Sequence, residues 1–473
     1  MKIIGRTREI DKLNRVLGSD RPEFIALYGR RRIGKTFLIN QLLEGKLAFA
    51  TTGILEGEPS EQMFSCHSSV QSYGSTCKKP RDWFEAFGEL IVLLEKSTRS
   101  TRVIFIDELP CFDTSRSRFV MALGHFWNSW ASRQSNVKLI VCGSATPWMV
   151  KNIIDNHGGL HNRITCEMHL TPFTLNEVEQ FLKQKKFTWS RHLIALAYMT
   201  FGGIPYYLDL LDPTESLAQN IDRLFFAENA TLRREYDRLF KSLFKMPDIY
   251  VKIIELLSEN KKGLTRQEIA EKMCKMSGGT LTSALKNLQY CDFIRRYNIK
   301  EKKIKTNGGV YQLMDFFVHF VLHFSKKQIT DDRYWSNMLH SATVTAWQGV
   351  AFERLVMAHI AQVKRALGIY NIHTEYFSWR SKMSDKGAQI DLVIDRADRM
   401  THLCEIKFGD APFRITKSED EKMRTRIADY QYETNTKQGI IPTFVTAYGL
   451  ATNEYSQGVM ATVTLDQLFD NLS

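Results

Sequence analysis

The sequence predicts a multidomain α/β protein whose first domain is built on a parallel sheet. Apolar runs occupy residues 24–28, 103–106 and 139–142, and the run at 103–106 shows no alternation, which is typical of a strand covered on both faces. A helical pattern begins shortly after the first run, as in a strand–loop–helix unit. At 473 residues the chain is too long for one hydrophobic core, and we expect about three domains.

The composition bounds the kind of protein to expect. The chain is 44% hydrophobic and 25% charged, and its net charge of +12 favours a polyanionic partner. Eight scattered cysteines with no Cys-x-x-Cys pair argue for a reducing compartment and against zinc. Residues 1–6 lack the apolar core of a signal peptide, and no uncharged apolar run approaches the ~18 residues of a membrane span. We therefore expect a cytoplasmic protein without a membrane segment.

The central motif of the first domain is GRRRIGKT at residues 29–36, which follows a strand and opens a helix, the context of a P-loop. Its glycines let backbone N–H groups turn toward a phosphate, and the helix N-terminus adds partial positive charge. We expect Lys35 to reach the β- and γ-phosphates of ATP and Thr36 to ligate Mg²⁺. The predicted nucleotide-binding set is Gly29, Arg30, Arg31, Arg32, Ile33, Gly34, Lys35, Thr36 and Phe37.

The segments on either side of this motif carry weaker signals. Residues 6–17 form an amphipathic helical pattern that either lies near the nucleotide base or packs in the core. Residues 47–53 predict a second strand. The stretch that follows contains three potential metal ligands, Cys66, His67 and Cys77, but no ligand spacing supports a metal site.

Two carboxylates, Asp107 and Glu108, end the apolar run that begins at residue 103. Ligands bind at this edge of open α/β sheets, so we expect Asp107 to hold Mg²⁺ and Glu108 to polarise the attacking water. Ser144 ends the next apolar run and is a candidate for placing that water. Arg163 lies just before a fifth strand pattern; it could reach the γ-phosphate, in cis or from a neighbouring subunit, or be a surface arginine.

These motifs resemble the AAA+ side of the P-loop ATPases, in the branch related to the STAND switch proteins. The matching residues are 29–36, Asp-Glu-Leu-Pro at 107–110, Phe-Trp-Asn at 126–128 and Gly-Gly-Ile-Pro-Tyr-Tyr-Leu at 202–208. The resemblance implies an ATPase core over residues 1–172 and a helical lid over residues 173–245, with ATP and Mg²⁺ as cofactors.

Residues 246–315 predict a small domain of helices and two strands. Thr265 is placed to cap the second helix, and strand patterns near 293–297 and 310–313 flank a basic loop. This order resembles a winged-helix domain. Residues 259–307 hold twelve Lys/Arg and five Asp/Glu, so their net charge is 12 − 5 = +7. Such a surface either binds DNA phosphates in a salt-dependent manner or packs against the ATPase with its lysines solvated.

An aromatic-rich stretch at residues 316–324 predicts a buried connecting helix within a linker over residues 316–340.

The last part of the chain contains a second group of candidate catalytic and metal-binding residues. Two strand patterns joined by a short turn are expected to pair as a hairpin. Because alternate residues of a strand share a face, pairing brings Asp391, Glu405 and Lys407 into one cluster, with Gln389 facing it. Upstream, Glu353 lies at the edge of an apolar helix stripe, a costly place for a carboxylate without a partner.

This order resembles the PD-(D/E)XK nuclease fold, over a domain at residues 341–473. The resemblance implies Asp391 and Glu405 as Mg²⁺ ligands, Lys407 as the residue that orients water or stabilises the phosphate, and Glu353 as a residue that tunes the metal. Inactive members of this fold keep partial sites as binding surfaces, so cleavage and binding both stay open.

The whole order of domains looks like a family of prokaryotic ATPases first noted in archaea and also common in gut Bacteroidetes. It implies ATP binding and hydrolysis coupled to DNA binding and Mg²⁺-dependent DNA cleavage. The alternatives are a nucleotide switch that binds without cutting, and a transcriptional regulator acting through the winged helix. A homo-oligomer is also left open.

Overall fold

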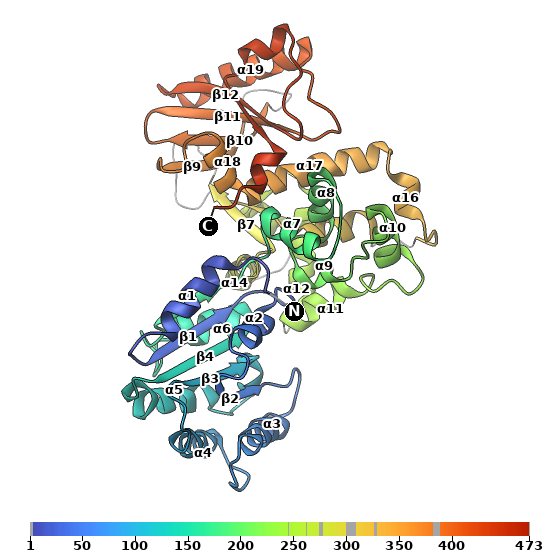
Figure 1. Cartoon of the computed structure of the whole chain (residues 1–473). Helices are drawn as coiled ribbons and strands as arrows, with labels where there is room; N and C mark the ends of the chain where they lie inside the picture. The colour runs from blue at the N-terminus through green and yellow to red at the C-terminus, as the bar shows by residue number, and fades with distance from the viewer. Residues whose placement is uncertain are drawn as a thin grey trace. The chain divides into compact units, whose positions relative to one another are not determined.

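The computed structural model describes residues 3–244, 246–261, 263–273, 278–298, 309–325, 329–381 and 388–472 (Figure 1). The chain forms two compact units that divide between Pro172 and Phe173. Within the described ranges, the helices are all too short or too polar to cross a membrane.

The first unit contains a five-stranded parallel sheet in the order β2-β3-β4-β1-β5. Its strands are β1 (Glu23–Tyr28), β2 (Leu47–Thr52), β3 (Arg102–Asp107), β4 (Val137–Gly143) and β5 (Cys166–His169). Every residue of β1 and β4 is buried, which confirms the parallel sheet predicted from the apolar runs. Because β4 lies between β1 and β3, the carboxyl ends of these three strands meet at one edge.

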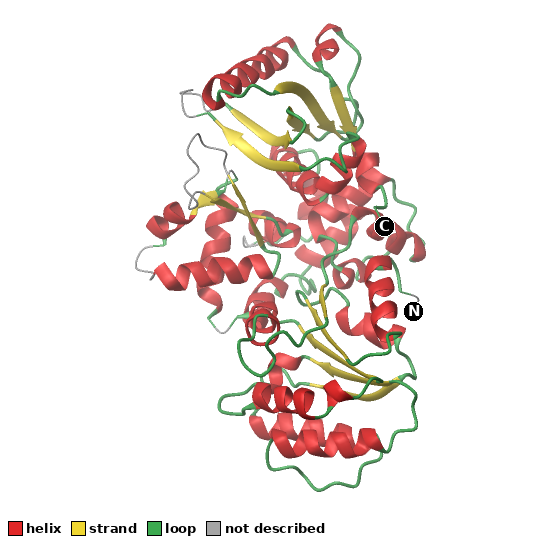
Figure 2. Ribbon diagram, turned by 90° about the vertical axis from the view of Figure 1, so that its left-hand side faces the viewer, coloured by secondary structure: helices red, strands yellow, loops and turns green. Residues whose placement is uncertain are grey.

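Helices connect these strands, as parallel pairing requires (Figure 2). They are α1 (Thr7–Leu17), α2 (Lys35–Leu42), α3 (Pro59–Ser72), α4 (Trp83–Glu95), α5 (Phe119–Ser129) and α6 (Thr146–Met149), with short helical turns η1 (Leu109–Phe112), η2 (Ala131–Arg133) and η3 (Val150–Ile154). Edge-to-face and stacked rings of Trp83, Phe112 and Phe119 pack α4 and α5 beside η1.

The second unit begins with helices, in the range where the resemblance implies a helical lid. These are α7 (Leu175–Gln184), α8 (Arg191–Phe201), α9 (Pro205–Asp209), α10 (Leu217–Ile221), η4 (Asp222–Phe226) and α11 (Glu235–Leu243). The glycines after α8 have a steric reason: Gly202 has a φ of +67°, and a Cβ on Gly203 would lie 2.0 Å from the carbonyl oxygen of Phe173.

A small mixed region follows, composed of α12 (Pro247–Glu259), β6 (Leu264–Thr265), α13 (Arg266–Lys272), α14 (Gly278–Tyr290), β7 (Ile294–Asn298) and β8 (Gly309–Leu313). Its antiparallel sheet has the order β6-β8-β7, so the structure adds β6 to the two predicted strands. Thr265 caps α13 as predicted, accepting a hydrogen bond from the backbone N–H of Glu268 at 3.2 Å. The predicted basic loop, residues 299–308, lies outside the described residues.

The remaining helices are α15 (Phe316–Phe320), η5 (Val321–Ser325), α16 (Tyr334–Met338), α17 (Ala342–Ala358) and α18 (Ile360–Ala366). All five residues of α15 are buried, in agreement with the predicted connecting helix. The apolar stripe over residues 352–363 predicts one helix, but the helix breaks at His359. There the ring Nε2 accepts a hydrogen bond from the backbone N–H of Leu175 at 3.0 Å, and the ring Nδ1 lies 2.9 Å from the carbonyl oxygen of Leu355.

A five-stranded mixed sheet, β13-β12-β11-β10-β9, completes the second unit. Its elements are β9 (Thr374–Arg380), β10 (Gln389–Arg396), β11 (Met400–Lys407), α19 (Lys417–Thr434), β12 (Gly439–Thr446), η6 (Glu454–Gly458), β13 (Ala461–Thr464) and η7 (Leu465–Phe469). The pairs β9–β10 and β10–β11 are antiparallel, whereas β11–β12 and β12–β13 are parallel. The predicted hairpin is therefore present as β10 and β11.

Candidate nucleotide and metal sites

The glycine loop after β1 has a backbone that only glycine can adopt at its start. Gly29 has a φ of +142°, and a Cβ there would lie 2.2 Å from the carbonyl oxygen of Leu170. Gly34, with a φ of +87°, forms the N-terminal cap of α2. The loop therefore turns tightly at the carboxyl end of β1 and aims the N-terminus of α2 into the turn.

Lys35 lies inside this loop. Its side chain is only 5% exposed, and its Nζ donates hydrogen bonds to the carbonyl oxygens of Gly29 at 2.9 Å and Arg30 at 2.8 Å. The ammonium group is thus held at the centre of the turn, where a phosphate group would meet it.

The loop is joined directly to the carboxylate at the end of β3. The Thr36 hydroxyl donates a hydrogen bond of 2.6 Å to Oδ2 of Asp107, and Oδ1 of Asp107 accepts from the backbone N–H of Glu108 at 2.9 Å. Hydroxyl and carboxylate oxygens are the ligands that Mg²⁺ prefers. The structure therefore brings together the two residues predicted to hold it.

Glu108 and Ser144 lie side by side at the ends of β3 and β4. Ser144 Oγ donates to Oε1 of Glu108 at 2.7 Å, and its backbone N–H donates to Oε2 at 3.3 Å. Glu108 has a φ of +44°, a left-handed conformation uncommon for this residue type. The turn that follows β3 directs the carboxylate toward Ser144 across the sheet edge.

The other predicted nucleotide-site residues differ in their surroundings. Arg30 is buried, Arg31 and Arg32 are partly buried, and Phe37 is exposed. Arg163 is exposed in the turn before β5. Sequence reasoning missed Arg6, a buried residue whose Nη2 donates to the carbonyl oxygen of Ile33 at 3.2 Å. No motif marks this arginine, because the contact depends on how α1 packs.

A second cluster lies where α17, β10 and β11 meet. Leu392 pairs with Cys404, which places Asp391 and Glu405 on neighbouring strands. Oδ2 of Asp391 accepts from the backbone N–H of Ile406 at 3.3 Å. The ammonium of Lys407 is 2.8 Å from Oε1 of Glu405.

The pKa values of three of the four predicted residues are shifted by burial and by charged neighbours in the group. Burial and the nearby Asp391 raise the pKa of Glu353 to about 8. Burial and Glu405 raise the pKa of Asp391 to about 7. Burial opposes the charge on Lys407, yet Glu405 and Asp391 together raise the pKa of its ammonium. Glu353, Asp391, Glu405 and Lys407 therefore interact electrostatically in the structure.

Arg426 is a member of this cluster that sequence reasoning did not single out. It projects from α19 and forms an ion pair with Oε2 of Glu405. Both carboxylate oxygens of Glu405 therefore face a cation. A charged helix gives no sequence signal that one of its arginines reaches a site.

A cavity of about 320 Å³ opens beside this cluster. Its wall includes the acidic Glu353 and Asp391 together with several cationic side chains: Lys261, Arg295, Arg354 and Arg380. Arg354 is only 1% exposed, and among the described residues its guanidinium has no hydrogen-bond partner. Burial lowers the pKa of Arg354 to about 9, against the opposing effect of Glu353. A buried cation of this kind favours an anionic ligand.

The fold and the first site together define the class: a parallel α/β sheet with a phosphate loop, a loop lysine and a Thr–Asp pair is the core of a P-loop ATPase. Residues 3–211 match a family described as an ATPase domain predominantly from Archaea. The chain therefore carries an archaeal-type ATPase domain, and the match extends through α9 of the second unit.

The chain is also similar to individual known proteins. The uncharacterized protein MJECL04 of Methanocaldococcus jannaschii is 25% identical over 419 residues, covering 88% of this chain and 89% of its own length. The uncharacterized ATP-binding protein MJ0423 of the same organism is 44% identical over 43 residues, which cover 9% of this chain and 73% of MJ0423. The Walker-type ATPase PABY2304 of Pyrococcus abyssi has a similar fold, with a TM-score of 0.51 and 20% identity over 68% of this chain and 96% of PABY2304.

Proposed function

We propose that the chain binds ATP with Mg²⁺ at residues 29–36 and hydrolyses it. The observation that carries this proposal is the 2.6 Å hydrogen bond between Thr36 and Asp107, because it joins two oxygen ligands from separate motifs at one point. A Cβ at Gly34 would meet no atom within 4 Å, so the N-terminus of α2 is open to a phosphate, and the residues present fit the nucleotide. Bound Mg²⁺ would neutralise charge on the phosphates.

Each residue has a distinct part in this reaction. Lys35 exchanges its loop carbonyls for phosphate oxygens, and Thr36 and Asp107 hold the metal. Glu108 accepts a hydrogen bond from the attacking water, while Ser144 keeps the carboxylate oriented. Arg163 is exposed, so a contact with phosphate would come after nucleotide binding or from a second copy of the chain.

The test is ATP binding and hydrolysis by the full chain, with Mg²⁺ present or chelated. Lys35→Ala should weaken ATP binding, and Thr36→Ala should remove the Mg²⁺ dependence of that binding. Lys46→Ala, a change at an exposed lysine after the P-loop helix, is the control. Unchanged Mg²⁺-dependent binding in both P-loop variants would refute the site.

We further propose that the second unit binds DNA and cleaves it at the cluster of Glu353, Asp391, Glu405 and Lys407. Two features support this. The order α12, α13, α14, β7, β8 is consistent with a winged helix. The order α17, β9, β10, β11, α19, β12 is consistent with a PD-(D/E)XK domain.

The cluster contains the residue types that phosphodiester cleavage needs. Asp391 and Glu405 offer oxygen ligands for Mg²⁺, which would neutralise charge on the scissile phosphate. The ion pair with Glu405 keeps the ammonium of Lys407 beside the proposed metal ligands, which supports a role in orienting water or contacting the phosphate. The adjacent cavity, with Arg295, Arg354 and other cations on its wall, is suited to the DNA backbone.

A second candidate function is binding of nucleic acid without cleavage. The specific observation in its favour is that Lys407 and Arg426 already neutralise both oxygens of Glu405. A carboxylate whose charge is already neutralised by two cations gains less from binding a metal ion. In that case ATP would control a binding surface and not a nuclease.

Cleavage and binding are separated by one experiment. Linear, supercoiled and single-stranded DNA are incubated with Mg²⁺, with and without ATP, and with wild type, Lys407→Ala or Lys437→Ala. Lys437 is an exposed lysine just before β12 and serves as the control. The start of β12 pairs with Met400 at the start of β11, whereas Lys407 lies at the end of β11. Cleavage lost only in Lys407→Ala supports the nuclease. DNA binding without cleavage in all three proteins supports the second candidate.

A further inference from the structure

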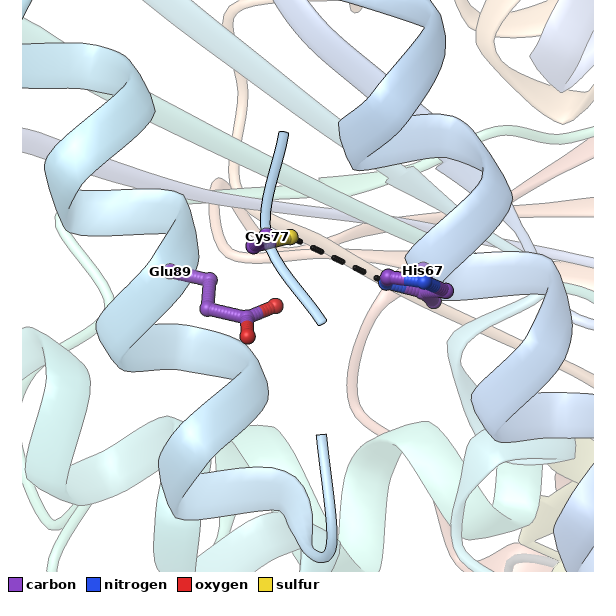
Figure 3. Close-up of side chains that lie close together, drawn as sticks. All are labelled: His67, Cys77 and Glu89. Atoms are coloured by element: carbon purple, nitrogen blue, oxygen red, sulfur yellow. Dashed lines mark hydrogen bonds between the residues drawn. The ribbon is translucent and has the colours of Figure 1, made fainter. Parts of the chain in front are cut away.

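Three side chains of the first unit converge outside the nucleotide site. His67 comes from α3, Cys77 from the segment after α3, and Glu89 from α4 (Figure 3). One ligand atom of each residue lies within 4.8 Å of the others, and Nδ1 of His67 is 3.8 Å from Sγ of Cys77. Cys66 lies next to His67 in the chain but is not a member of this group.

The spacing of the group is close to that of a metal site. With Zn–S of about 2.3 Å and Zn–N of about 2.05 Å, a tetrahedral angle puts sulfur and nitrogen about 3.6 Å apart. The observed 3.8 Å between His67 and Cys77 differs from this by only a few tenths of an ångström. A single ion could therefore bind both atoms with little movement.

The carboxylate supplies an independent indication. Oε2 of Glu89 is shielded from solvent, and within the described part of the chain it has no hydrogen-bond partner. Leaving a carboxylate oxygen in this state is costly unless a cation or a donor approaches it. In Figure 3 this side chain extends from α4 toward Cys77 and His67.

We propose that His67, Cys77 and Glu89 bind a divalent ion of the zinc class, through one nitrogen, one sulfur and one oxygen. Imidazole and thiolate select borderline and soft ions over Mg²⁺, so this ion is distinct from that of the nucleotide site. Three protein ligands leave a fourth position for water. The ion would fasten the segment between α3 and α4 to both helices. The ligands are ten and twelve residues apart in sequence, which is why no spacing signal indicates them.

The test uses Co²⁺ as a spectroscopic substitute for Zn²⁺, added to the reduced, nucleotide-free full chain. Binding is expected at one ion per chain, with a thiolate-to-Co²⁺ charge-transfer band and the visible bands of a tetrahedral site. Cys77→Ser should remove the charge-transfer band. It should also weaken affinity by more than the roughly 10–100-fold expected for loss of an outer-shell partner. Zn²⁺ should displace Co²⁺ and raise the Tm of wild type but not of Cys77→Ser.

Two further variants keep the outcome decisive. Cys66→Ser is the matched control and should retain the band, whereas Glu89→Gln, of the same shape, should weaken binding. ATP affinity of each variant shows that the first unit is folded. Absence of the band in wild type would overturn the proposal. An unchanged charge-transfer band in Cys77→Ser would also overturn it. A band that is lost in Cys66→Ser but kept in Cys77→Ser would overturn it as well. Either of the first two results would leave the three residues as a hydrogen-bonded cluster only.

Discussion

Replacement of Asp391 by asparagine should change how the stability of the second unit depends on pH, and the size of this change can be predicted. Both Asp391 and Glu353 have raised pKa values, about 7 and about 8, chiefly because they are buried. The folded chain therefore holds these protons more tightly than the unfolded chain. It follows that unfolding releases protons between about pH 4 and pH 8, and that stability falls as the pH rises through this window.

The size of the effect follows from the width of the window. For a carboxyl that is protonated only in the folded state, each rise of one pH unit lowers the free energy of unfolding by about 1.4 kcal/mol. Between pH 5 and pH 7 this amounts to at most about 2.7 kcal/mol for Asp391, and to about 2 kcal/mol because the folded-state carboxyl is already half ionised at pH 7. An asparagine at this position has no proton to release, and its neutrality also lowers the pKa of Glu353 by removing a nearby negative charge.

Calorimetric unfolding of wild type and Asp391→Asn, free of nucleotide and metal, measures this difference at pH 5, 7 and 8. Between pH 5 and pH 7 the free energy of unfolding of the variant should rise by about 2 kcal/mol relative to that of wild type. Added Mg²⁺ should stabilise wild type more at pH 8 than at pH 5, because metal competes with protons for the carboxylates. A wild-type–variant difference that is independent of pH would refute the raised pKa of Asp391 in the folded chain.

Three changes in the first unit test its geometry. Gly29→Ala should abolish ATP binding, because its Cβ would lie 2.2 Å from a backbone oxygen. The Cβ of Gly34→Ala would meet no neighbouring atom, so this variant should lose only about 1–2 kcal/mol of stability to left-handed backbone strain. The Tm and the ATP affinity of the two variants check this difference. Arg6→Ala removes one hydrogen bond to the P-loop, worth about 1 kcal/mol, and should weaken ATP binding about fivefold by calorimetric titration. Ser144→Ala should leave ATP affinity unchanged and lower kcat about tenfold, because one hydrogen bond to a carboxylate, worth about 1.5 kcal/mol, is lost; equal kcat values would exclude a positioning role.

The sequence is most informative where local pattern decides the structure. The apolar runs of β1, β3 and β4 predict buried parallel strands, and Thr36 and Asp107 meet although they are 71 residues apart. Strand polarity explains this success, since parallel strands end at one edge wherever they lie in the chain. The hairpin of Asp391 and Glu405 was predictable for a similar reason, because alternation assigns each side chain to a face.

What the sequence could not predict depends on how distant surfaces pack. The contact of Arg6 with the P-loop follows from the docking of α1, and the ion pair of Arg426 with Glu405 from the position of α19. The hydrogen bond that the His359 ring accepts from Leu175 joins residues 184 positions apart. The grouping of His67 with Glu89 likewise requires two helices to lie side by side. None of these contacts has a sequence period or a motif.

The most direct measurement of the proposed function is the rate of ATP hydrolysis by Glu108→Gln compared with wild type, alongside ATP affinity for both. Glu108 is expected to position water without holding the nucleotide, since its carboxylate faces Ser144 at 2.7 Å. The variant should therefore bind ATP and Mg²⁺ as wild type does while its kcat falls about 100-fold or more. Wild-type turnover in Glu108→Gln, or loss of turnover explained entirely by lost ATP binding, would contradict the assignment.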